Sequence, residues 1–404
     1  MENKHTMSDL YQMKSLPLSA KISMTARRIN EWVNEFGEDG VYLSFSGGKD
    51  STVLGHIIRE VCGYKNIPFV FVDVPTQYPE LKQFAMTFDN LVILKPKISF
   101  AEVCEKYGFP LISKEVSNCV SGARKYLKYL DNKKNANTIL TDRQTDRQTD
   151  RQTVPYACYM ADLLGIDRRI NKQNEQYKSL RMGVIPSGSE YRLRRLNGEL
   201  TDSKGNYSQF NQEKYKFFLD APFEISDLCC DIMKKKPAHD YEKKTGRKPI
   251  IATMASESVM RTQKWLQDGC NAFNVTRPHS NPMSFWTEQD VLLYIKENNL
   301  PICSVYGDVV TDYEAMGQCE NQMSFADFGI FGKERPLLKT TGCQRTGCVL
   351  CGFGCHLEKE SRFLRLKETH PKFHNLLYIL KNNGVTYAEA IDWVNEHGNM
   401  NIKY

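Results

Sequence analysis

The chain has 404 residues, 41% of them hydrophobic and 25% charged, which is enough for one large domain and a smaller one. Neither a membrane-spanning stretch nor an apolar run of signal-peptide length in residues 1–10 is visible, so we expect a cytoplasmic protein. In that reducing compartment the 13 cysteines are not expected to form a disulfide framework, and their odd number points some of them toward metal binding or catalysis. The formal net charge is +6.

The first part of the chain alternates between helix and strand patterns. We predict helices at 22–36, 80–88 and 100–107, and strands at 41–45, 67–74 and 91–94. The strands are nearly continuous apolar runs, which is typical of a parallel sheet covered on both faces. The sequence therefore predicts an α/β fold with a doubly wound, mostly parallel sheet.

A glycine-rich turn, Ser46–Ser51, joins the first predicted strand to the next helix. Gly47 and Gly48 lack a Cβ atom, so the backbone can bring its N–H groups close to a phosphate. The helix that begins near Asp50 directs its dipole and its unpaired amides to the same place. We therefore predict a phosphate-binding loop, to which Lys49 adds a positive charge.

The string Ser46–Ser51 resembles the SGGxDS loop of the PP-loop ATP pyrophosphatases and of their relatives, the adenylyl sulfate (APS) and phosphoadenylyl sulfate (PAPS) reductases. The resemblance implies a HUP-like, adenine nucleotide alpha hydrolase fold. It also implies that ATP, or PAPS or APS, binds here with Mg²⁺, and that Lys49 and Asp50 take part in catalysis. The implied contacts come from Ser44, Ser46, Gly47, Gly48, Lys49, Asp50 and Ser51.

Asp73 ends the second predicted strand. Because ligands of open α/β sheets bind beyond the carboxyl ends of the strands, we expect Asp73 beside the loop, near a ribose or a magnesium ion. The alternative is that Asp73 only caps the turn toward Pro75.

Residues 132–215 interrupt the pattern and form a basic, partly disordered insertion. From Arg124 to Lys216 the chain has 19 Lys and Arg against 11 Asp and Glu, so its positive charge is concentrated there. Such a segment can hold DNA or RNA through its charges and aromatic side chains. The available tyrosines are Tyr156, Tyr159, Tyr177, Tyr191 and Tyr207. The alternative is a solvated insertion whose lysines only keep it soluble.

The insertion contains three identical Thr-Asp-Arg-Gln units, in residues 141–153, without an apolar residue. They predict a disordered or frayed-helical linker. The units can be encoded by a tandem ACAG tetranucleotide, and such tandems slip during replication. We hypothesise a phase-variable repeat that switches expression among sibling cells. Sequencing the locus from many colonies tests this, and mixed synonymous codons or a fixed unit number contradict it.

The regular pattern returns at Phe217, with a helix predicted from Leu228, a strand at 249–254 and a further helix from Ala255. Glu257 and Arg261 resemble the ES-x-x-R element of the same reductases, which implies that Arg261 faces the sulfate or phosphate of the nucleotide. Without that resemblance the run is an ordinary helix N-terminus. Residues 281–291 and 300–308 resemble further segments of the family, so the resemblance covers roughly residues 41–308.

Cysteines near the C-terminus are spaced as metal ligands. Cys348 and Cys351 are two residues apart among glycines, which is the usual half-site for zinc or an iron–sulfur cluster. Cys343 and Cys355 complete a local set that suits Zn²⁺. The adjacent pair Cys229 and Cys230 instead resembles the other half of the [4Fe-4S] site of the APS reductases. We therefore favour Cys229, Cys230, Cys348 and Cys351 on a [4Fe-4S] cluster.

The reductases attack sulfate sulfur with a thiol in a C-terminal Glu-Cys-Gly-x-His element. Here no cysteine follows Cys355, and Cys355-His356 lacks the flanking Glu and Gly, so Cys355 is at best a rearranged nucleophile. The terminal residues 358–404 are predicted to form two amphipathic helices that serve packing.

Three functions compete on this sequence. We favour a PP-loop ATP pyrophosphatase of the sulfurtransferase type that adenylates nucleic acid, as in DNA phosphorothioation. The alternatives are a PAPS or APS reductase and a non-catalytic nucleotide-binding regulator. The implied partners are an adenine nucleotide, DNA or RNA, and a sulfur donor protein or a thioredoxin-like reductant, and a homodimer is left open. The predicted segments are 1–131 and 216–320 for the nucleotide-binding domain, 132–215 for the insertion and 321–404 for the Cys-rich region with its helices.

Overall fold

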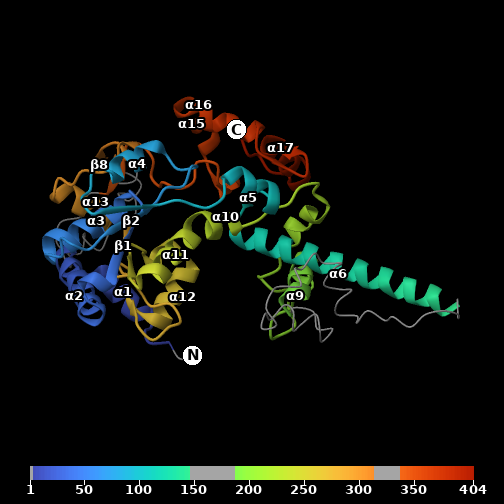
Figure 1. Cartoon of the computed structure of the whole chain (residues 1–404), viewed down its shortest axis with the longest axis horizontal. Helices are drawn as coiled ribbons and strands as arrows, with labels where there is room; N and C mark the ends of the chain where they lie inside the picture. Colours follow the sequence, from blue (N-terminus) through green and yellow to red (C-terminus); the bar gives the residue numbers. More distant parts are fainter. Residues whose placement is uncertain (1–2, 146–186, 314–336) are drawn as a thin grey trace. The chain divides into compact units, whose positions relative to one another are not determined.

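The computed structural model of the chain describes residues 3–145, 187–313 and 337–404 (Figure 1). The chain forms two compact units. Unit 1 comprises Met1–Ser99 and Cys230–Val349, and unit 2 comprises Phe100–Cys229 and Leu350–Tyr404. The division of the sequence into four segments stays a prediction. In the described ranges, no helix has both the length and the apolar character needed to cross a membrane.

Unit 1 is built around a six-stranded sheet with the order β3-β2-β1-β5-β7-β6. The strands are β1 (Val41–Phe45), β2 (Phe69–Val72), β3 (Leu91–Leu94), β5 (Lys248–Ile251), β6 (Asn271–Ala272) and β7 (His279–Ser280). Neighbours are parallel except for β6 and β7. The predicted α/β fold with a mostly parallel sheet is therefore confirmed.

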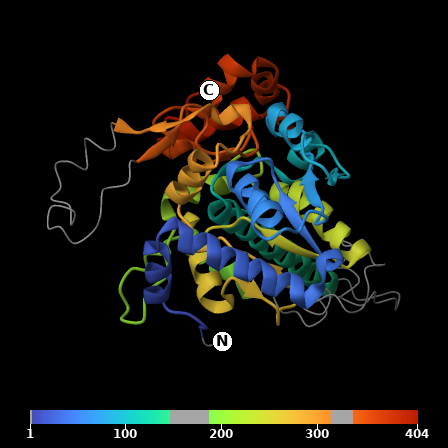
Figure 2. The same ribbon diagram turned by 90° about the vertical axis from the view of Figure 1, so that its left-hand side faces the viewer.

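Helices cover both faces of this sheet. Leu43 and Phe45 of β1 belong to a buried core with residues of α2 (Leu18–Phe36) and α13 (Glu288–Glu297). On the opposite face the aromatic ring of Tyr42 packs against that of Tyr241 in α11 (Lys236–Thr245), with the ring centroids 5.3 Å apart. Figure 2 shows α2, in blue, lying across the sheet. Alternation along β1 thus explains how one strand contacts two helical layers.

The other elements of unit 1 are short. They are α1 (Met7–Ser15), α3 (Lys49–His56), α4 (Pro79–Ala85), α12 (Val259–Asp268) and an antiparallel pair of β8 (Val309–Thr311) and β9 (Leu338–Thr340). A buried ion pair joins α2 to α13, with Lys21 Nζ 2.5 Å from Asp290 Oδ2. A π-helical turn, Asp231–Lys235, precedes α11.

Unit 2 contains α5 (Phe100–Tyr107), α6 (Lys114–Thr145), α9 (Ser187–Leu196) and α17 (Tyr387–Gly398). Two short strands, β4 (Leu111–Ile112) and β10 (Gly352–Phe353), pair in parallel. The guanidinium of Arg124 on α6 donates hydrogen bonds to the carbonyl oxygens of Phe218, Ala221 and Phe223. This arginine therefore fixes the return of the chain after the insertion.

Two sequence predictions for unit 2 have structural outcomes. The repeat at 141–153 begins inside α6, which ends at Thr145, and its remainder lies outside the described residues. The C-terminal region has α15 (Arg362–Thr369), α16 (Pro371–His374) and α17, with a hairpin of β11 (Lys381–Asn382) and β12 (Val385–Thr386) between α16 and α17. The helix faces bury Phe363, Leu366, Ala388, Ile391 and Val394. These residues serve packing, but the segment forms three helices and a hairpin where two helices were predicted, because the turn at Asn383 and Gly384 reverses the chain between α16 and α17.

Candidate active site

The predicted phosphate-binding loop links β1 to α3 and has a fixed internal geometry. Gly47 has φ +70°, and a Cβ atom there would lie 2.9 Å from the carbonyl oxygen of Leu81. Only glycine fits this backbone without strain. The Ser46 N–H donates to Ser51 Oγ at 3.2 Å, and Ser51 Oγ donates to the carbonyl of Gly48 at 2.9 Å. The two serine hydroxyls and Gly47 therefore shape the turn.

A polar cavity of about 210 Å³ opens at this loop. It is lined by Ser46, Gly48, Lys49, Asp50, Met254, Glu257, Glu288, Tyr306, Arg345 and Thr346. Sites that enclose a whole small ligand are usually about 300–1,000 Å³, so this cavity suits the phosphate groups of a nucleotide rather than a complete one.

Lys49 is buried and held by groups distant in sequence. Its Nζ donates to the carbonyl of Gln344 at 2.8 Å and lies 3.0 Å from Glu288 Oε1. Its backbone N–H donates to the hydroxyl of Tyr306 at 3.3 Å. That hydroxyl is 2.7 Å from Thr346 Oγ1, and burial raises the pKa of Tyr306, so it stays protonated. Arg345 and Thr346 therefore form one wall of the cavity, and the neighbouring Gln344 carbonyl orients the lysine.

Asp50 follows this lysine in the sequence, and among the described residues its carboxylate lacks a hydrogen bond that a buried polar group normally has. Burial raises the pKa of Asp50, an effect that Lys49 opposes and that Glu257 and Glu288 increase. Its Oδ1 is buried without a hydrogen-bond partner in the described part of the chain. Buried polar atoms are normally paired, so this oxygen marks a position where a ligand or a cation would bind.

Glu257 and Arg261 interact directly, but only Glu257 lines the cavity. The Arg261 guanidinium forms an ion pair with Glu257 Oε2, which also accepts a hydrogen bond from the backbone N–H of Met254 at 3.0 Å. Asp73 does not line the cavity either, and its Oδ2 pairs with Lys82 Nζ at 2.7 Å. Contacts of Arg261 and Asp73 with a nucleotide stay predictions.

Five residues that line the cavity were not predicted as site residues from the sequence, namely Met254, Glu288, Tyr306, Arg345 and Thr346. Glu288 and Tyr306 lie in segments that resemble the family, so a signal existed for them. Arg345 and Thr346 lie inside the cysteine motif, whose spacing predicted metal binding only. Arg345 is the second cation of the cavity after Lys49.

Comparisons with known proteins agree with this loop and sheet. A family model described as the phosphoadenosine phosphosulfate reductase domain matches residues 40–158 and 189–352, well over half of the chain. The chain belongs to this family. The solved structure of the PAPS reductase from Candida auris, in a phosphate complex, is similar at 12% identity and a TM-score of 0.32, over 75% of this chain and 92% of that one. A search of curated proteins finds no match.

The predicted cluster ligands of this PAPS reductase family member are divided between the units. Cys230 and Cys348 belong to unit 1, and Cys229 and Cys351 belong to unit 2. Cys229 is buried, and the other three are half-buried. Within the described ranges, no group of three or more His, Cys, Asp or Glu is arranged to hold a metal ion. Both the four-cysteine cluster and the alternative zinc set stay predictions.

The two remaining cysteines of the motif are buried. The Cys343 thiol lies 3.7 Å from the Tyr78 hydroxyl. The Cys355 thiol donates to the carbonyl of Gly352, and burial raises its pKa to about 12. A buried thiol with so high a pKa is a poor nucleophile at neutral pH, which weighs against the predicted catalytic role of Cys355.

The C-terminal part of the basic insertion exposes aromatic side chains. Tyr191, Tyr207 and Phe210 are 46%, 62% and 57% exposed, and they line a shallow cavity of about 530 Å³. Arg194 and Arg195 lie on the same helix as Tyr191. Tyr156, Tyr159 and Tyr177 lie outside the described residues. Arg195 is only 13% exposed and pairs with Glu115, whereas Arg194 is half exposed. The exposed aromatic rings and Arg194 therefore suit contacts with nucleobases and phosphates.

Proposed function

We propose that this chain is a PP-loop ATP pyrophosphatase that adenylates an oxygen of a nucleic acid acceptor for sulfur transfer. One carboxylate of the cavity carries this proposal. Asp50 Oδ1 is buried without a hydrogen-bond partner in the described part of the chain, whereas Glu257 is paired with Arg261 and Glu288 with Lys49. ATP brings Mg²⁺, which prefers carboxylate and phosphate oxygens. The unpaired Oδ1 of Asp50 supports a metal ligand at that position.

In the proposed reaction the acceptor oxygen attacks the α-phosphorus of ATP, and the bond to the β-phosphate oxygen breaks. Lys49 and Arg345 stabilise the charge of the departing pyrophosphate. Gly48 lines the cavity without a side chain, so the phosphates can approach the backbone of the turn closely. Sulfur at the oxidation level of sulfide then attacks the acceptor atom that carries the adenylated oxygen and supplies the electron pair of the new bond. The bond from that atom to the oxygen breaks, and AMP leaves with the oxygen.

The predicted cysteines fit an iron–sulfur cluster by their chemistry. Cys230, Cys348 and Cys351 are half-buried thiols, so iron can reach them from solvent. Bound at Cys229, Cys230, Cys348 and Cys351, a [4Fe-4S] cluster would supply sulfur to the adenylated acceptor. Zn²⁺ on the local set of Cys343, Cys348, Cys351 and Cys355 would only be structural.

The second candidate is a PAPS or APS reductase, which the family match favours. That reaction needs a thiolate, and the burial of Cys355 disfavours it. A third candidate, a regulator, would bind nucleotide without turning it over.

Products formed by anaerobically purified protein test the proposal. With ATP, Mg²⁺ and an oligonucleotide we expect pyrophosphate and AMP, and with PAPS and thioredoxin we expect no sulfite. Sulfite from PAPS would establish the reductase, and binding of either nucleotide without products would establish the regulator. Asp50→Asn is the matched inactive control.

A further inference from the structure

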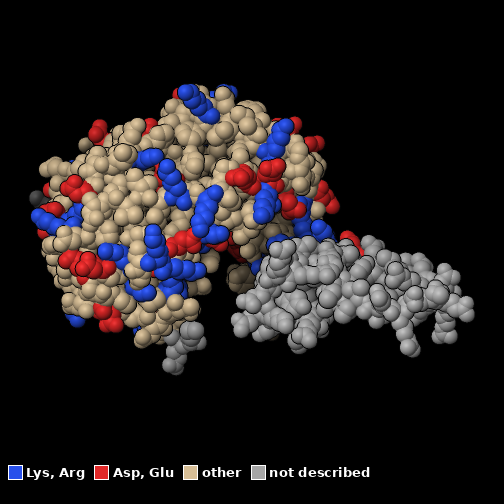
Figure 3. Space-filling view, in the orientation of Figure 1, with Lys and Arg blue, Asp and Glu red and all other residues tan. Residues whose placement is uncertain are grey.

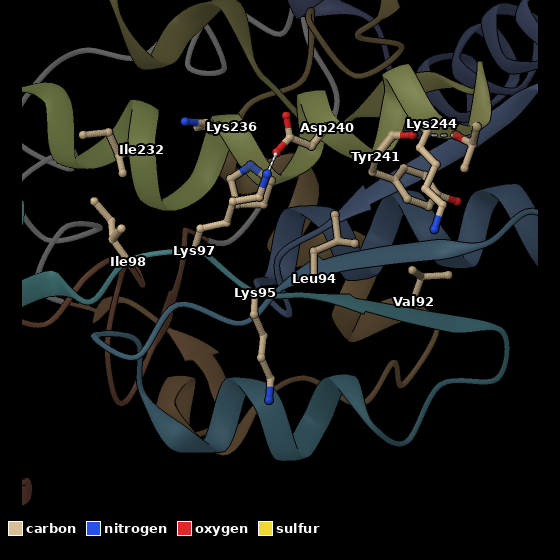
Figure 4. A pocket seen from close by; sticks show the side chains of 12 residues that line it. Val92, Leu94, Lys95, Lys97, Ile98, Ile232, Lys236, Asp240, Tyr241 and Lys244 are labelled. Carbon is tan, nitrogen blue, oxygen red and sulfur yellow. Dashed lines mark hydrogen bonds and ion pairs between the residues drawn. The ribbon is translucent and has the colours of Figure 1, made fainter.

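A second cavity of unit 1, of about 420 Å³, lies between the edge strand β3 and helix α11. Its floor is aliphatic and half-buried, with Val92 and Leu94 on the strand side and Ile98 and Ile232 at one end. Figure 4 shows Ile98 and Ile232 facing each other there, with Tyr241 toward the other end beside Lys244. We call this cavity the β3–α11 groove.

Lysines surround the groove. Lys95, Lys97, Lys236 and Lys244 line it with a single acid, Asp240. Lys97 Nζ pairs with Asp240 at 2.9 Å, and the pKa of that carboxyl is lowered by this hydrogen bond and by nearby lysines. For the other three lysines no ion pair is found in the described part of the chain, so the groove is strongly cationic. Figure 3 shows the blue side chains gathered over α11.

The position of the groove relates it to the candidate active site. Lys95 follows β3 at the same edge of the sheet where the phosphate-binding loop follows β1. β3 and β1 are separated by β2 alone, and strands are about 4.8 Å apart, so the ends of these two strands are about 10 Å apart across the sheet. About three nucleotides of an extended strand can span the distance between the two strand ends.

We propose that the β3–α11 groove binds an extended single strand of nucleic acid, which is the acceptor of the proposed adenylation. The proposal rests on the proposed function. Phosphates contact Lys95, Lys236 and Lys244, and base faces cover the aliphatic floor. A single strand fits better than a duplex, because a duplex keeps its base faces stacked inside and would leave the floor exposed to water. An acidic peptide would satisfy the lysines but has no reason to lie beside the nucleotide site.

The test measures binding of labelled oligothymidylate to the full chain. Lys236→Glu with Lys244→Glu reverses two groove charges. Lys65→Glu with Lys296→Glu is the matched control, because both lysines are exposed and Lys296 also ends a helix. We expect the groove variant to bind the oligonucleotide at least about tenfold more weakly than wild type. The affinity of the control variant should stay within about twofold of wild type. The slope of log K against log salt should fall by about 1.4, for two lost phosphate contacts to a single strand.

Three results would refute nucleic-acid binding in the groove. They are equal binding by both double variants, loss of binding only with Arg194→Glu in the insertion, and displacement by polyglutamate that is as effective as displacement by unlabelled oligothymidylate. Pyrophosphate release from ATP is measured on the same samples. Groove-dependent binding without pyrophosphate release would uphold the nucleic-acid site while refuting adenylation, so the two proposals fail separately.

Discussion

Asp50 combines an unpaired buried oxygen with a raised pKa, which is costly for the folded protein. Because the folded state holds the Asp50 proton more tightly than the unfolded chain does, this group favours folding below the ordinary Asp pKa. That contribution is lost as the pH rises through the folded pKa. At neutral pH the ionised carboxylate therefore opposes folding.

Asp50→Asn is expected to lower pyrophosphate release by about 100-fold, since it removes a group that would bind the nucleotide's metal. The same variant should melt at a higher temperature than wild type near pH 7.5, and the difference should shrink near pH 4.5. Calorimetric melting without nucleotide at both pH values measures this. A variant that is less stable than wild type at neutral pH would contradict the account of Asp50.

Arg345 is a cation of the cavity that the sequence pattern did not reveal. Arg345→Gln is expected to weaken nucleotide binding by about 10- to 100-fold, because a charge-assisted hydrogen bond to phosphate is worth about 1.5–3 kcal/mol. Titration calorimetry with ATP and Mg²⁺ measures the change. Arg27→Gln, on a 78% exposed side chain of α2, is the control and should leave affinity unchanged. Equal affinities for the two variants would remove Arg345 from the site.

Helices α2 and α13 depend on the buried pair of Lys21 and Asp290. Lys21→Met leaves the Asp290 carboxylate buried without its cation, and we expect a loss of about 3–5 kcal/mol in the free energy of unfolding. Arg27→Ala breaks an exposed ion pair on the same helix and should cost less than about 1 kcal/mol. Urea titration of both variants measures the difference. Similar decreases in the free energy of unfolding of both variants would show that the buried pair of Lys21 and Asp290 stabilises the protein no more than an exposed one.

At the element scale, apolar periodicity predicted β1, β3 and α5 to the residue. β2 is shorter than expected, since Pro68 has no amide hydrogen for the ladder and the strand begins at Phe69. The turn at Asp231–Lys235 is π-helical, which a 3.6-residue pattern does not distinguish from the helix around it. The loop at Ser46–Ser51 was predictable because its chemistry is local. Tyr306 and Thr346 reach it only through the fold.

At the scale of the whole molecule, the family match is interrupted between residues 158 and 189, inside the predicted insertion. Only residues 159–188 fall outside the match, so the family model covers the rest of the predicted insertion. Tyr191, Tyr207 and Phe210 lie in the matched part, so nucleic-acid contacts made there would involve a region that the family shares.

Metal content distinguishes the two predicted cysteine sets. If the cluster forms, Cys230→Ser should lower iron per chain and the broad visible absorbance of anaerobic protein, since Cys230 belongs only to that set. Cys343→Ser should lower zinc instead if the local set holds the metal. Cys62→Ser is the control, because Cys62 belongs to neither set. Metal analysis of all three variants decides, and unchanged iron and zinc in Cys230→Ser and Cys343→Ser would refute both sets.

The segment from Cys343 to Cys348 also supplies the Gln344 carbonyl that holds Lys49 and the Thr346 hydroxyl that meets Tyr306. Oxidation of Cys348 in air would disturb these contacts while the glycine turn stays intact. An oxidised sample would then fail to bind ATP although the reduced protein can bind it. The affinity for ATP, measured before and after reduction of the thiols, therefore distinguishes oxidised protein from a chain that cannot bind ATP at all.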